Sequence, residues 1–271
     1  MPDTPPRQKT ACLLVIGNEV LSGRTRDANL PHLAQELNDA GVRLAEARVI
    51  PDDRDVIVAT VNECRARFDF VFTTGGIGPT HDDITSECIA AAFGVALERN
   101  PEALARLNAH YKPGELNENR LRMANIPAGG ELIDNPISKA PGFRLENVYV
   151  MAGVPMIMQA MFAGIKHRFA GGPRMLSRTV AGLVPEGRLA AGLGRVQDDH
   201  PEVEVGSYPF FRDGRLGVSV VMRGFDPAAL EATAADVRTL IRDLGGSPIE
   251  GEPGQEDLGK NDLAADAPPR D

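Results

Sequence analysis

Residues 73–85 read TTGGIGPTHDDIT, and the apolar segment 70–73 leads into them. An apolar run of this length that ends in glycines predicts a buried strand followed by a loop. The three glycines of the loop lack a Cβ atom, so its backbone can approach a ligand closely. A helix that begins near Asp83 would add unpaired N–H groups and the positive end of its dipole. The stretch therefore predicts a cradle for a phosphate-bearing ligand, with a plain tight turn as the alternative.

Strands and helices alternate on both sides of this loop. The apolar spacing predicts strands at residues 10–16, 43–50 and 70–73, helices at 27–40, 53–67, 84–93 and 155–169, and a hairpin at 142–151 that turns at Glu146-Asn147. Strands that alternate with helices of these lengths indicate βαβ units. We therefore expect an α/β domain with a mixed, mainly parallel sheet over residues 10–170, after a flexible segment at residues 1–9.

Three of these strands end in turns that contain Gly or Pro. The ligands of open α/β sheets bind beyond the carboxyl ends of the strands. Parallel strands bring these ends to one edge of the sheet, so the three turns should form one crevice. The ligand-binding residues that we expect there are Gly17, Glu19, Thr73, Thr74, Gly75, Gly76, Gly78, Pro79, Thr80, Gly153 and Pro155.

Four acidic residues should face the same crevice. Asp82 and Asp83 stand at the predicted start of a helix, Glu19 follows the first strand, and Asp27 begins the next helix. Carboxylates beside a phosphate repel it unless a hard cation bridges them, and Mg²⁺ binds through one or two carboxylates plus phosphate oxygens. We interpret Asp83, Asp27 and Asp82 as candidate catalytic acids, and Asp83 and Glu19 as candidate metal ligands. The alternative for these aspartates is helix capping, which stabilises a helix by about 1 kcal/mol.

A different pattern follows the sequence Gly171-Gly172-Pro173. Strands at residues 177–183, 203–208 and 216–223 and helices at 186–197 and 226–244 predict a small α+β domain over residues 175–245. The tail, residues 246–271, is rich in Pro, Gly and acids and poor in large apolar residues. Such a composition cannot bury enough apolar surface to offset chain ordering, so we expect the tail to be disordered.

Charge and composition limit the partners of the chain. The formal net charge is −9, which disfavours binding to nucleic acid over a broad surface. The apolar runs are too short for a membrane span, and the N-terminus has no apolar signal segment. Cys12, Cys64 and Cys88 follow no metal or disulfide spacing. We therefore expect a cytoplasmic protein that binds a small ligand and has buried, free thiols.

The quoted loop resembles the signature loop of the molybdopterin-binding MoaB/Mog-like domain. GNEVLSGRTRDAN at residues 17–29, NPISKAPGF at residues 135–143 and AGVP at residues 152–155 fit that domain in order. The combination is similar to the N-terminal part of the CinA, or competence/damage-inducible protein A, family. The pterin-type domain attached to eukaryotic FAD synthases is similar too. The resemblance implies a three-layer α/β/α fold and places Ser138 opposite the Gly-rich loop.

The resemblance also implies two related chemistries. In the molybdenum-cofactor enzymes, acids matching Asp27 and Asp83 serve Mg²⁺-assisted adenylyl transfer. CinA-type members are associated with metal-dependent hydrolysis of ADP-ribose-like pyrophosphates. Asp82 stands where Arg is frequent in the cofactor-synthesis branch, which favours the CinA branch. Longer CinA proteins carry a C-terminal amidohydrolase domain, and we expect this chain of 271 residues to be too short to contain it.

The first hypothesis is therefore a metal-dependent pyrophosphatase that acts on ADP-ribose-like or dinucleotide substrates with Mg²⁺, Mn²⁺ or Co²⁺. The second is a protein of molybdenum cofactor metabolism that binds or adenylylates molybdopterin. The third is a non-enzymatic regulator that binds a ligand or RNA. A KH-type GxxG loop joins helices, whereas residues 214–217 stand between two predicted strands, which disfavours RNA. The sequence leaves a homo-oligomer open.

Overall fold

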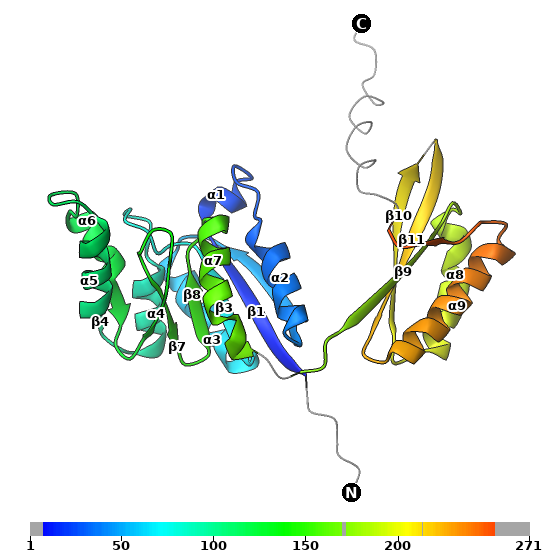
Figure 1. Ribbon diagram of the computed structural model, residues 1–271, viewed down its shortest axis with the longest axis horizontal. Helices are drawn as coiled ribbons and strands as arrows, with labels where there is room; N and C mark the ends of the chain where they lie inside the picture. Colours follow the sequence, from blue (N-terminus) through cyan, green and yellow to red (C-terminus); the bar gives the residue numbers. More distant parts are fainter. Residues whose placement is uncertain (1–7, 170–171, 213, 253–271) are drawn as a thin grey trace, which may run out of the picture. The chain divides into compact units, whose positions relative to one another are not determined.

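The computed structural model describes residues 8–169, 172–212 and 214–252. The chain divides into two compact units, Met1–Arg174 and Met175–Asp271, and both are drawn in Figure 1. The Gly-rich loop and the turns expected to surround it all belong to the first unit.

A six-stranded sheet forms the middle layer of the first unit, in the order β2-β1-β3-β8-β7-β6. Its strands are β1 (Lys9–Ile16), β2 (Val42–Ile50), β3 (Phe70–Thr74), β6 (Glu131–Ile133), β7 (Gly142–Leu145) and β8 (Val148–Met151). The β1–β2, β1–β3 and β3–β8 pairs are parallel, whereas β6–β7 and β7–β8 are antiparallel. The expected mixed, mainly parallel sheet is confirmed.

Helices cover both faces of this sheet (Figure 1), so the three-layer α/β/α arrangement is confirmed as well. On one face, α2 (Asn29–Asp39) and α7 (Pro155–Ile165), which continues as η2 (Lys166–Phe169), build a core with Leu33, Leu37 and Phe162. On the other face, α3 (Arg54–Arg67), α4 (Thr85–Phe93) and α5 (Pro101–His110) build a core with Ile57, Ile89 and Leu107.

Local signals explain where several helices begin and end. The Asp53 carboxylate accepts a hydrogen bond from the backbone N–H of Val56 at 3.0 Å and so caps α3. Gly94 ends α4 in the left-handed conformation, with φ 65°. α2 begins at Asn29, two residues later than the spacing predicted. The Asp27 carboxylate accepts hydrogen bonds from the first two N–H groups of this helix, as the capping alternative expected.

The segment between α4 and β7 contains elements that the apolar spacing did not predict. They are β4 (Leu97–Arg99), α5, α6 (Glu118–Leu121), η1 (Arg122–Ala124), β5 (Asn125–Pro127) and β6. β4 and β5 pair with each other in a separate two-stranded sheet. This arrangement brings Arg122 and Asn125 to the start of α4.

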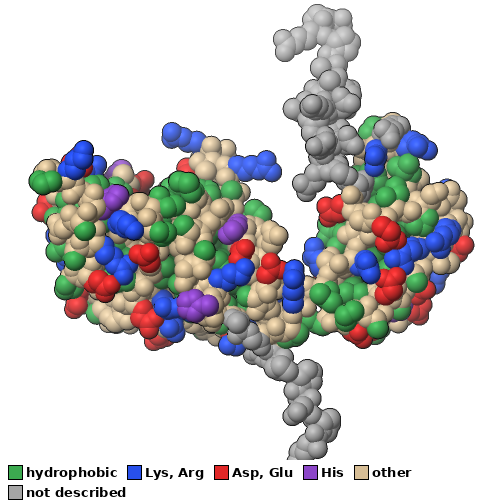
Figure 2. All heavy atoms as spheres, viewed as in Figure 1, with side chains coloured by type: hydrophobic (Ala, Val, Ile, Leu, Met, Phe, Trp, Pro, Cys, Tyr) green, Lys and Arg blue, Asp and Glu red, His purple; other side chains and the backbone are tan. Residues whose placement is uncertain are grey.

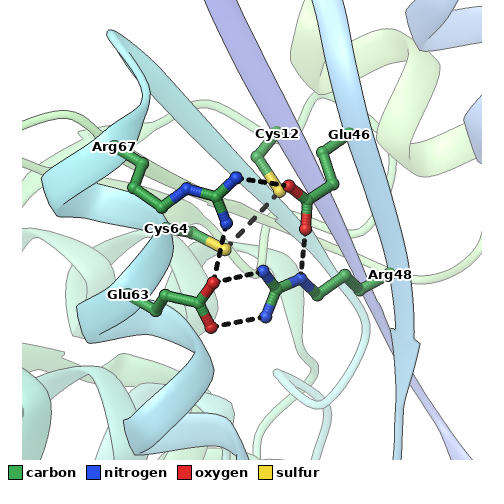
Figure 3. Close-up of polar contacts among 6 residues, drawn as sticks. All are labelled: Cys12, Glu46, Arg48, Glu63, Cys64 and Arg67. Atoms are coloured by element: carbon green, nitrogen blue, oxygen red, sulfur yellow. Dashed lines mark hydrogen bonds and ion pairs between the residues drawn. The ribbon is translucent and has the colours of Figure 1, made fainter.

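Two buried thiols meet between β1 and α3 (Figure 3). The Sγ atoms of Cys12 and Cys64 lie 3.6 Å apart, and neither residue is exposed to solvent. Burial raises the pKa of both thiols above the usual range. The expected free and buried state of these cysteines is confirmed, and their inaccessibility gives them a packing role in the core.

An ion-pair cluster covers these thiols on the protein surface (Figure 3). Glu63 accepts hydrogen bonds from both Arg48 and Arg67, at 2.6 to 2.7 Å, and these guanidinium groups lower the pKa of Glu63 to about 2. Glu46 of β2 contacts the same two arginines. The cluster therefore ties the edge strand β2 to α3.

The second unit contains one antiparallel sheet with two helices packed on it. Its elements are β9 (Leu176–Gly182), α8 (Glu186–Asp199), β10 (Glu204–Arg212), β11 (Arg215–Gly224), α9 (Pro227–Asp243) and β12 (Ile249–Glu250). The strand order is β10-β11-β9-β12. A core around Val180, Leu189, Val220 and Val237 joins the sheet to both helices. The expected small α+β domain is confirmed.

β12 corrects the expected boundary of the tail. Residues 246–271 were expected to be disordered, but Ile249 and Glu250 pair with Ala181 and Val180 of β9. The Glu250 carboxylate also accepts hydrogen bonds from Arg238 of α9, at 2.6 and 3.2 Å. These long-range contacts, which composition does not reveal, add this short strand to the sheet. Residues 253–271 lie outside the described part of the chain, as do residues 1–7 of the expected N-terminal segment.

Among the residues that the structure describes, no helix combines the length and the apolar character needed to cross a membrane.

Candidate functional site

The Gly-rich loop follows β3 and reverses direction through two glycines in the left-handed region. Gly75 has φ 103° and Gly76 has φ 68°. A Cβ atom on Gly75 would collide with the carbonyl oxygen of Ile16, and one on Gly76 would collide with the hydroxyl of Thr85. Both positions therefore require glycine for two reasons, backbone conformation and close packing.

Three turns converge at this loop, as their parallel strands predicted. The backbone N–H of Gly75 donates to the carbonyl oxygen of Met151 at the end of β8, at 3.2 Å. A Cβ atom on Gly153 would lie 3.2 Å from the Cα atom of Gly75. Since Ile16 ends β1, the ends of β1, β3 and β8 contact one another through their backbones.

A hollow lies beside these turns, on the side of the sheet that α2 and α7 cover. We call it the first hollow. It is lined by Val15, Ile16, Glu19, Val20, Thr25, Arg26, Asp27, Ala28, Asn29, Thr74, Gly153 and Pro155. The expected residues Glu19, Asp27, Thr74, Gly153 and Pro155 are thus brought together in one place.

The segment after β1 forms the outer wall of the first hollow. It begins with the short helix α1 (Asn18–Leu21). The backbone N–H of Asn18 donates a hydrogen bond to the carboxylate of Asp52 at 2.9 Å. Figure 2 shows basic side chains standing out beside α1. Arg24 and Arg26 of this segment are exposed, and neither has a carboxylate partner within the described residues. The wall therefore offers positive charge at the rim of the hollow.

The floor of the first hollow contains buried oxygen atoms without partners. Asn29 is 3% exposed, and its Nδ2 donates to the carbonyl oxygen of Gly153 at 2.8 Å. Within the described residues, Asn29 Oδ1 and the hydroxyl oxygen of Thr74, which line the hollow, have no hydrogen-bond partner, and neither does the hydroxyl of Thr73, which does not line it. Buried polar groups are nearly always paired, so such atoms call for a ligand or a bound water. Sequence reasoning missed Asn29, although Asn29 ends the quoted run at residues 17–29.

The two acids of the first hollow suit a hard cation. Asp27 accepts hydrogen bonds from the backbone N–H groups of Asn29 at 3.3 Å and Leu30 at 2.9 Å. Glu19 is exposed and folds over Gly17. Neither carboxylate pairs with Lys or Arg in the described part of the chain, so both keep lone pairs for a cation.

The part of the chain that the structure describes contains no complete, preformed metal site. Within the described residues, no group of three or more His, Cys, Asp or Glu side chains is placed to hold a metal ion. Mg²⁺ typically takes one or two carboxylates and completes its shell with substrate phosphates and water. Glu19 and Asp27 fit that pattern, because each supplies a carboxylate and a bound phosphate would supply the rest.

Asp83 lies away from these acids and braces the loop. It lines a different hollow, together with Ile77, Gly78, Ser86, Glu87, Leu97, Arg122 and Asn125, which we call the second hollow. The Asp83 carboxylate accepts two hydrogen bonds from Thr80, from its backbone N–H at 2.7 Å and from its hydroxyl. The cap position of α4 belongs to Ile84, so the capping alternative for Asp83 is wrong. Glu19 and Asp83, expected as joint metal ligands, line separate hollows.

The other expected site residues differ in where they lie relative to the two hollows. Asp82 is exposed, and hydrogen bonding within the end of the loop lowers the pKa of Asp82. Ser138 lies in a turn built by buried Asn135, whose Nδ2 donates to the Ser138 hydroxyl at 2.6 Å. Ser138 lines neither hollow, and Pro79 and Thr80 likewise lie outside both.

Comparison with known proteins shows the class of the first unit. The family described as "Probable molybdopterin binding domain" matches residues 12–170, and that described as "FAD synthase, middle domain" matches residues 174–244. The first match covers more than half of the chain and includes both hollows. The fold and this match define the first unit as a domain of the molybdopterin-binding class.

Similar proteins narrow the class further. A protein of Archaeoglobus fulgidus is 37% identical over 198 residues, which are 73% of this chain and 84% of that protein. A CinA-like protein of Citrifermentans bemidjiense is 40% identical over 192 residues, which are 68% of this chain and 42% of that protein. A crystal structure of CinA, a protein of unknown function from Thermoplasma acidophilum, is 33% identical with a TM-score of 0.57, and the match covers 59% of this chain and 98% of that one. The chain belongs to the CinA-like family of molybdopterin-binding domain proteins.

Proposed function

We propose that the first unit binds a pyrophosphate-bearing nucleotide in the first hollow and hydrolyses it with a divalent metal ion. ADP-ribose-like molecules and dinucleotides are the substrate class. The observation that carries the proposal is the pair of buried, unpartnered oxygen atoms, Asn29 Oδ1 and Thr74 Oγ1, beside the carboxylates of Glu19 and Asp27. A buried polar group without a partner costs about 1–3 kcal/mol, and a polar ligand would remove that cost.

Each group of the first hollow has a role in this proposal. Gly75 and Gly76 let the loop pack closely against Ile16 and Thr85, and Thr74, directly before them, lines the hollow. Glu19 and Asp27 would hold Mg²⁺, Mn²⁺ or Co²⁺, which neutralises phosphate charge and lowers the pKa of bound water. The Asn29 side chain is held in place because its Nδ2 donates to the carbonyl oxygen of Gly153. Its unpartnered Oδ1 would therefore orient the ligand. In the net reaction, water adds to one phosphorus, the bridging P–O bond breaks, and two monophosphates and a proton are released.

The test is turnover of ADP-ribose with Mg²⁺, Mn²⁺ or Co²⁺, followed by mass spectrometry of AMP and ribose 5-phosphate. Asp27→Asn and Glu19→Gln should each lower the rate by about 100-fold, because charge stabilisation at a metal contributes several kcal/mol. Asp55→Asn is the matched control, since Asp55 is an exposed acid in the first turn of α3. Wild-type rates in both variants, or no turnover with any of the three metals, would contradict the proposal.

The family match favours a second candidate, because its description names molybdopterin. In that case the same cradle binds the terminal phosphate of the pterin, and transfer of an adenylyl group from ATP is the related chemistry. Fluorescence titration with molybdopterin and release of pyrophosphate from ATP would detect these two activities. Submicromolar binding of the pterin without ADP-ribose turnover would favour this candidate over the first.

A further inference from the structure

The second hollow lies on the other side of the sheet edge from the first. Ile77 packs against the core that α4 and α5 share, whereas Val15 of the first hollow belongs to the core under α2 and α7. The Gly-rich loop contributes Ile77 and Gly78 to the second hollow, and the preceding Thr74 lines the first. One loop therefore has a hollow on each side.

Two carboxylates, those of Asp83 and Glu87, and one guanidinium, that of Arg122, line the second hollow. The Asp83 carboxylate accepts hydrogen bonds from Thr80 and keeps its negative charge, and the Glu87 carboxylate lies 3.8 Å from the guanidinium of Arg54. Arg122 has no carboxylate partner within the described residues. Its Nη2 donates only a long hydrogen bond, 3.4 Å, to the carbonyl oxygen of Asp83. A half-buried guanidinium in this state is suited to a phosphate or carboxylate.

Groups that suit a nucleoside lie next to this guanidinium. Asn125 accepts a hydrogen bond from Arg99 at its Oδ1, at 3.3 Å, while its Nδ2 has no partner in the described structure. Ile77 and Leu97 present apolar surface, and Leu97 is 37% exposed. The hollow is partly open to solvent, and its volume of about 90 Å³ suits a phosphate, with the attached nucleoside lying outward along Leu97.

We propose that the second hollow binds a nucleoside monophosphate unit, with its phosphate on Arg122 and its nucleoside against Leu97 and Asn125. This inference rests on the proposed function in one respect. The nucleoside monophosphate unit is taken to be one half of a dinucleotide pyrophosphate substrate, and the other half of that substrate occupies the first hollow. The Gly-rich loop then lies under the bond between the halves, because it borders both hollows. Arg122 is a specificity-determining residue in this arrangement and takes no part in bond cleavage.

Calorimetry with three probes, AMP, adenosine and inorganic phosphate, tests the inference. AMP should bind the wild-type chain more tightly than either adenosine or phosphate. Arg122→Gln should weaken AMP binding about tenfold, as expected for loss of a charge-assisted phosphate contact, and leave weak adenosine binding unchanged. Arg122→Lys should recover part of the loss, which shows that charge at this position and not folding is measured. Arg120→Gln is the matched control, because Arg120 stacks on Tyr111 and lines neither hollow.

Several outcomes overturn the inference. They are the absence of AMP binding at millimolar concentration, equal binding of AMP and inorganic phosphate, or wild-type AMP affinity in Arg122→Gln. Loss of AMP binding in Asn29→Ala but not in Arg122→Gln places the nucleotide in the first hollow and also overturns it. The proposed function fails separately: if ADP-ribose is not hydrolysed while Arg122→Gln still weakens AMP binding, the hydrolysis is wrong and the second site stands.

Discussion

Asp83 is held by Thr80 through two hydrogen bonds to one carboxylate oxygen, from the backbone N–H at 2.7 Å and from the hydroxyl. A Cβ atom on Gly78 would lie 2.7 Å from the same oxygen. The end of the Gly-rich loop is therefore closed over the Asp83 side chain, and its shape depends on that carboxylate.

We expect Asp83→Asn to lower turnover of ADP-ribose about tenfold. Asn keeps one oxygen for the backbone N–H of Thr80 but loses the charge that strengthens both hydrogen bonds, and such bonds are about twice as strong as neutral ones. Steady-state kinetics and thermal unfolding would be measured together. A loss of 100-fold or more at unchanged melting temperature would instead support the direct catalytic or metal-binding role that the sequence suggested for Asp83.

Gly76→Ala should destabilise the first unit by at least ~2 kcal/mol. A non-glycine residue in the left-handed region costs about 1–2 kcal/mol, and the new methyl group would displace Thr85, whose hydroxyl donates to the carbonyl oxygen of Gly75 at 3.0 Å. The measurement is urea unfolding. Gly164→Ala is the control, since Gly164 of α7 has open space around it and should gain about 0.5–1 kcal/mol from helix propensity. Equal stability of the two variants would refute the packing that we describe.

The free energy of unfolding should fall as the pH rises above about 9. Burial raises the pKa of Cys88 from 9.0 to about 11. Above pH 9 the thiol ionises in the unfolded chain but stays protonated in the native one, so the unfolded state binds fewer protons and gains stability. The stabilisation is complete below pH 9 and is lost as the pH approaches 11.

Urea unfolding at pH 8 and pH 10 measures this effect against Cys88→Ala. Removal of the thiol creates a small cavity at both pH values, so only the difference between them reports on ionisation. The wild-type chain should lose more stability between the two pH values than the variant does, by up to about 1.4 kcal/mol per pH unit. Identical losses would show that the thiol ionises equally in both states.

A chain that ends at Gly246 should have a lower melting temperature than one that ends at Glu252. The shorter chain loses β12, which pairs with β9, and the Arg238–Glu250 ion pair. Differential scanning calorimetry of the second unit's transition would compare the two with the full chain. A melting temperature shared by both truncated chains would mean that Ile249 and Glu250 contribute nothing to the sheet.

The main strands and helices of the first unit were predictable because their signals are local. The apolar runs of β1 and β3, the Asp53 cap of α3 and the terminal Gly94 of α4 all act within a few residues. The strands between α4 and β7 were not predictable, because β4, β5 and β6 have only three residues each and depend on partners elsewhere in the chain. α5 was overlooked, although the Asn100 cap and Pro101 at its first position are local signals.

The sequence predicted those features of the candidate site that depend on the path of the backbone. Glycine content revealed the loop, and the parallel strands revealed that the turns around it converge. Asn29 and Arg122 were missed, because what distinguishes them is an oxygen without a partner and a guanidinium without a carboxylate. These properties arise only when distant segments pack together, and no residue spacing encodes them.

The mutual contact of Gly75 and Gly153 has a consequence for how ligand preference can change in evolution or in the laboratory. A side chain on Gly153 would press on the backbone of Gly75, and one on Gly75 would collide with the carbonyl oxygen of Ile16, so substitutions there are removed by selection for folding before they can alter recognition. New preferences must arise at the rims instead, at positions such as Arg26, Leu97 and Arg122, where side chains vary at little cost to stability. Libraries directed to these three positions should yield folded variants with altered ligands far more often than libraries directed to the loop.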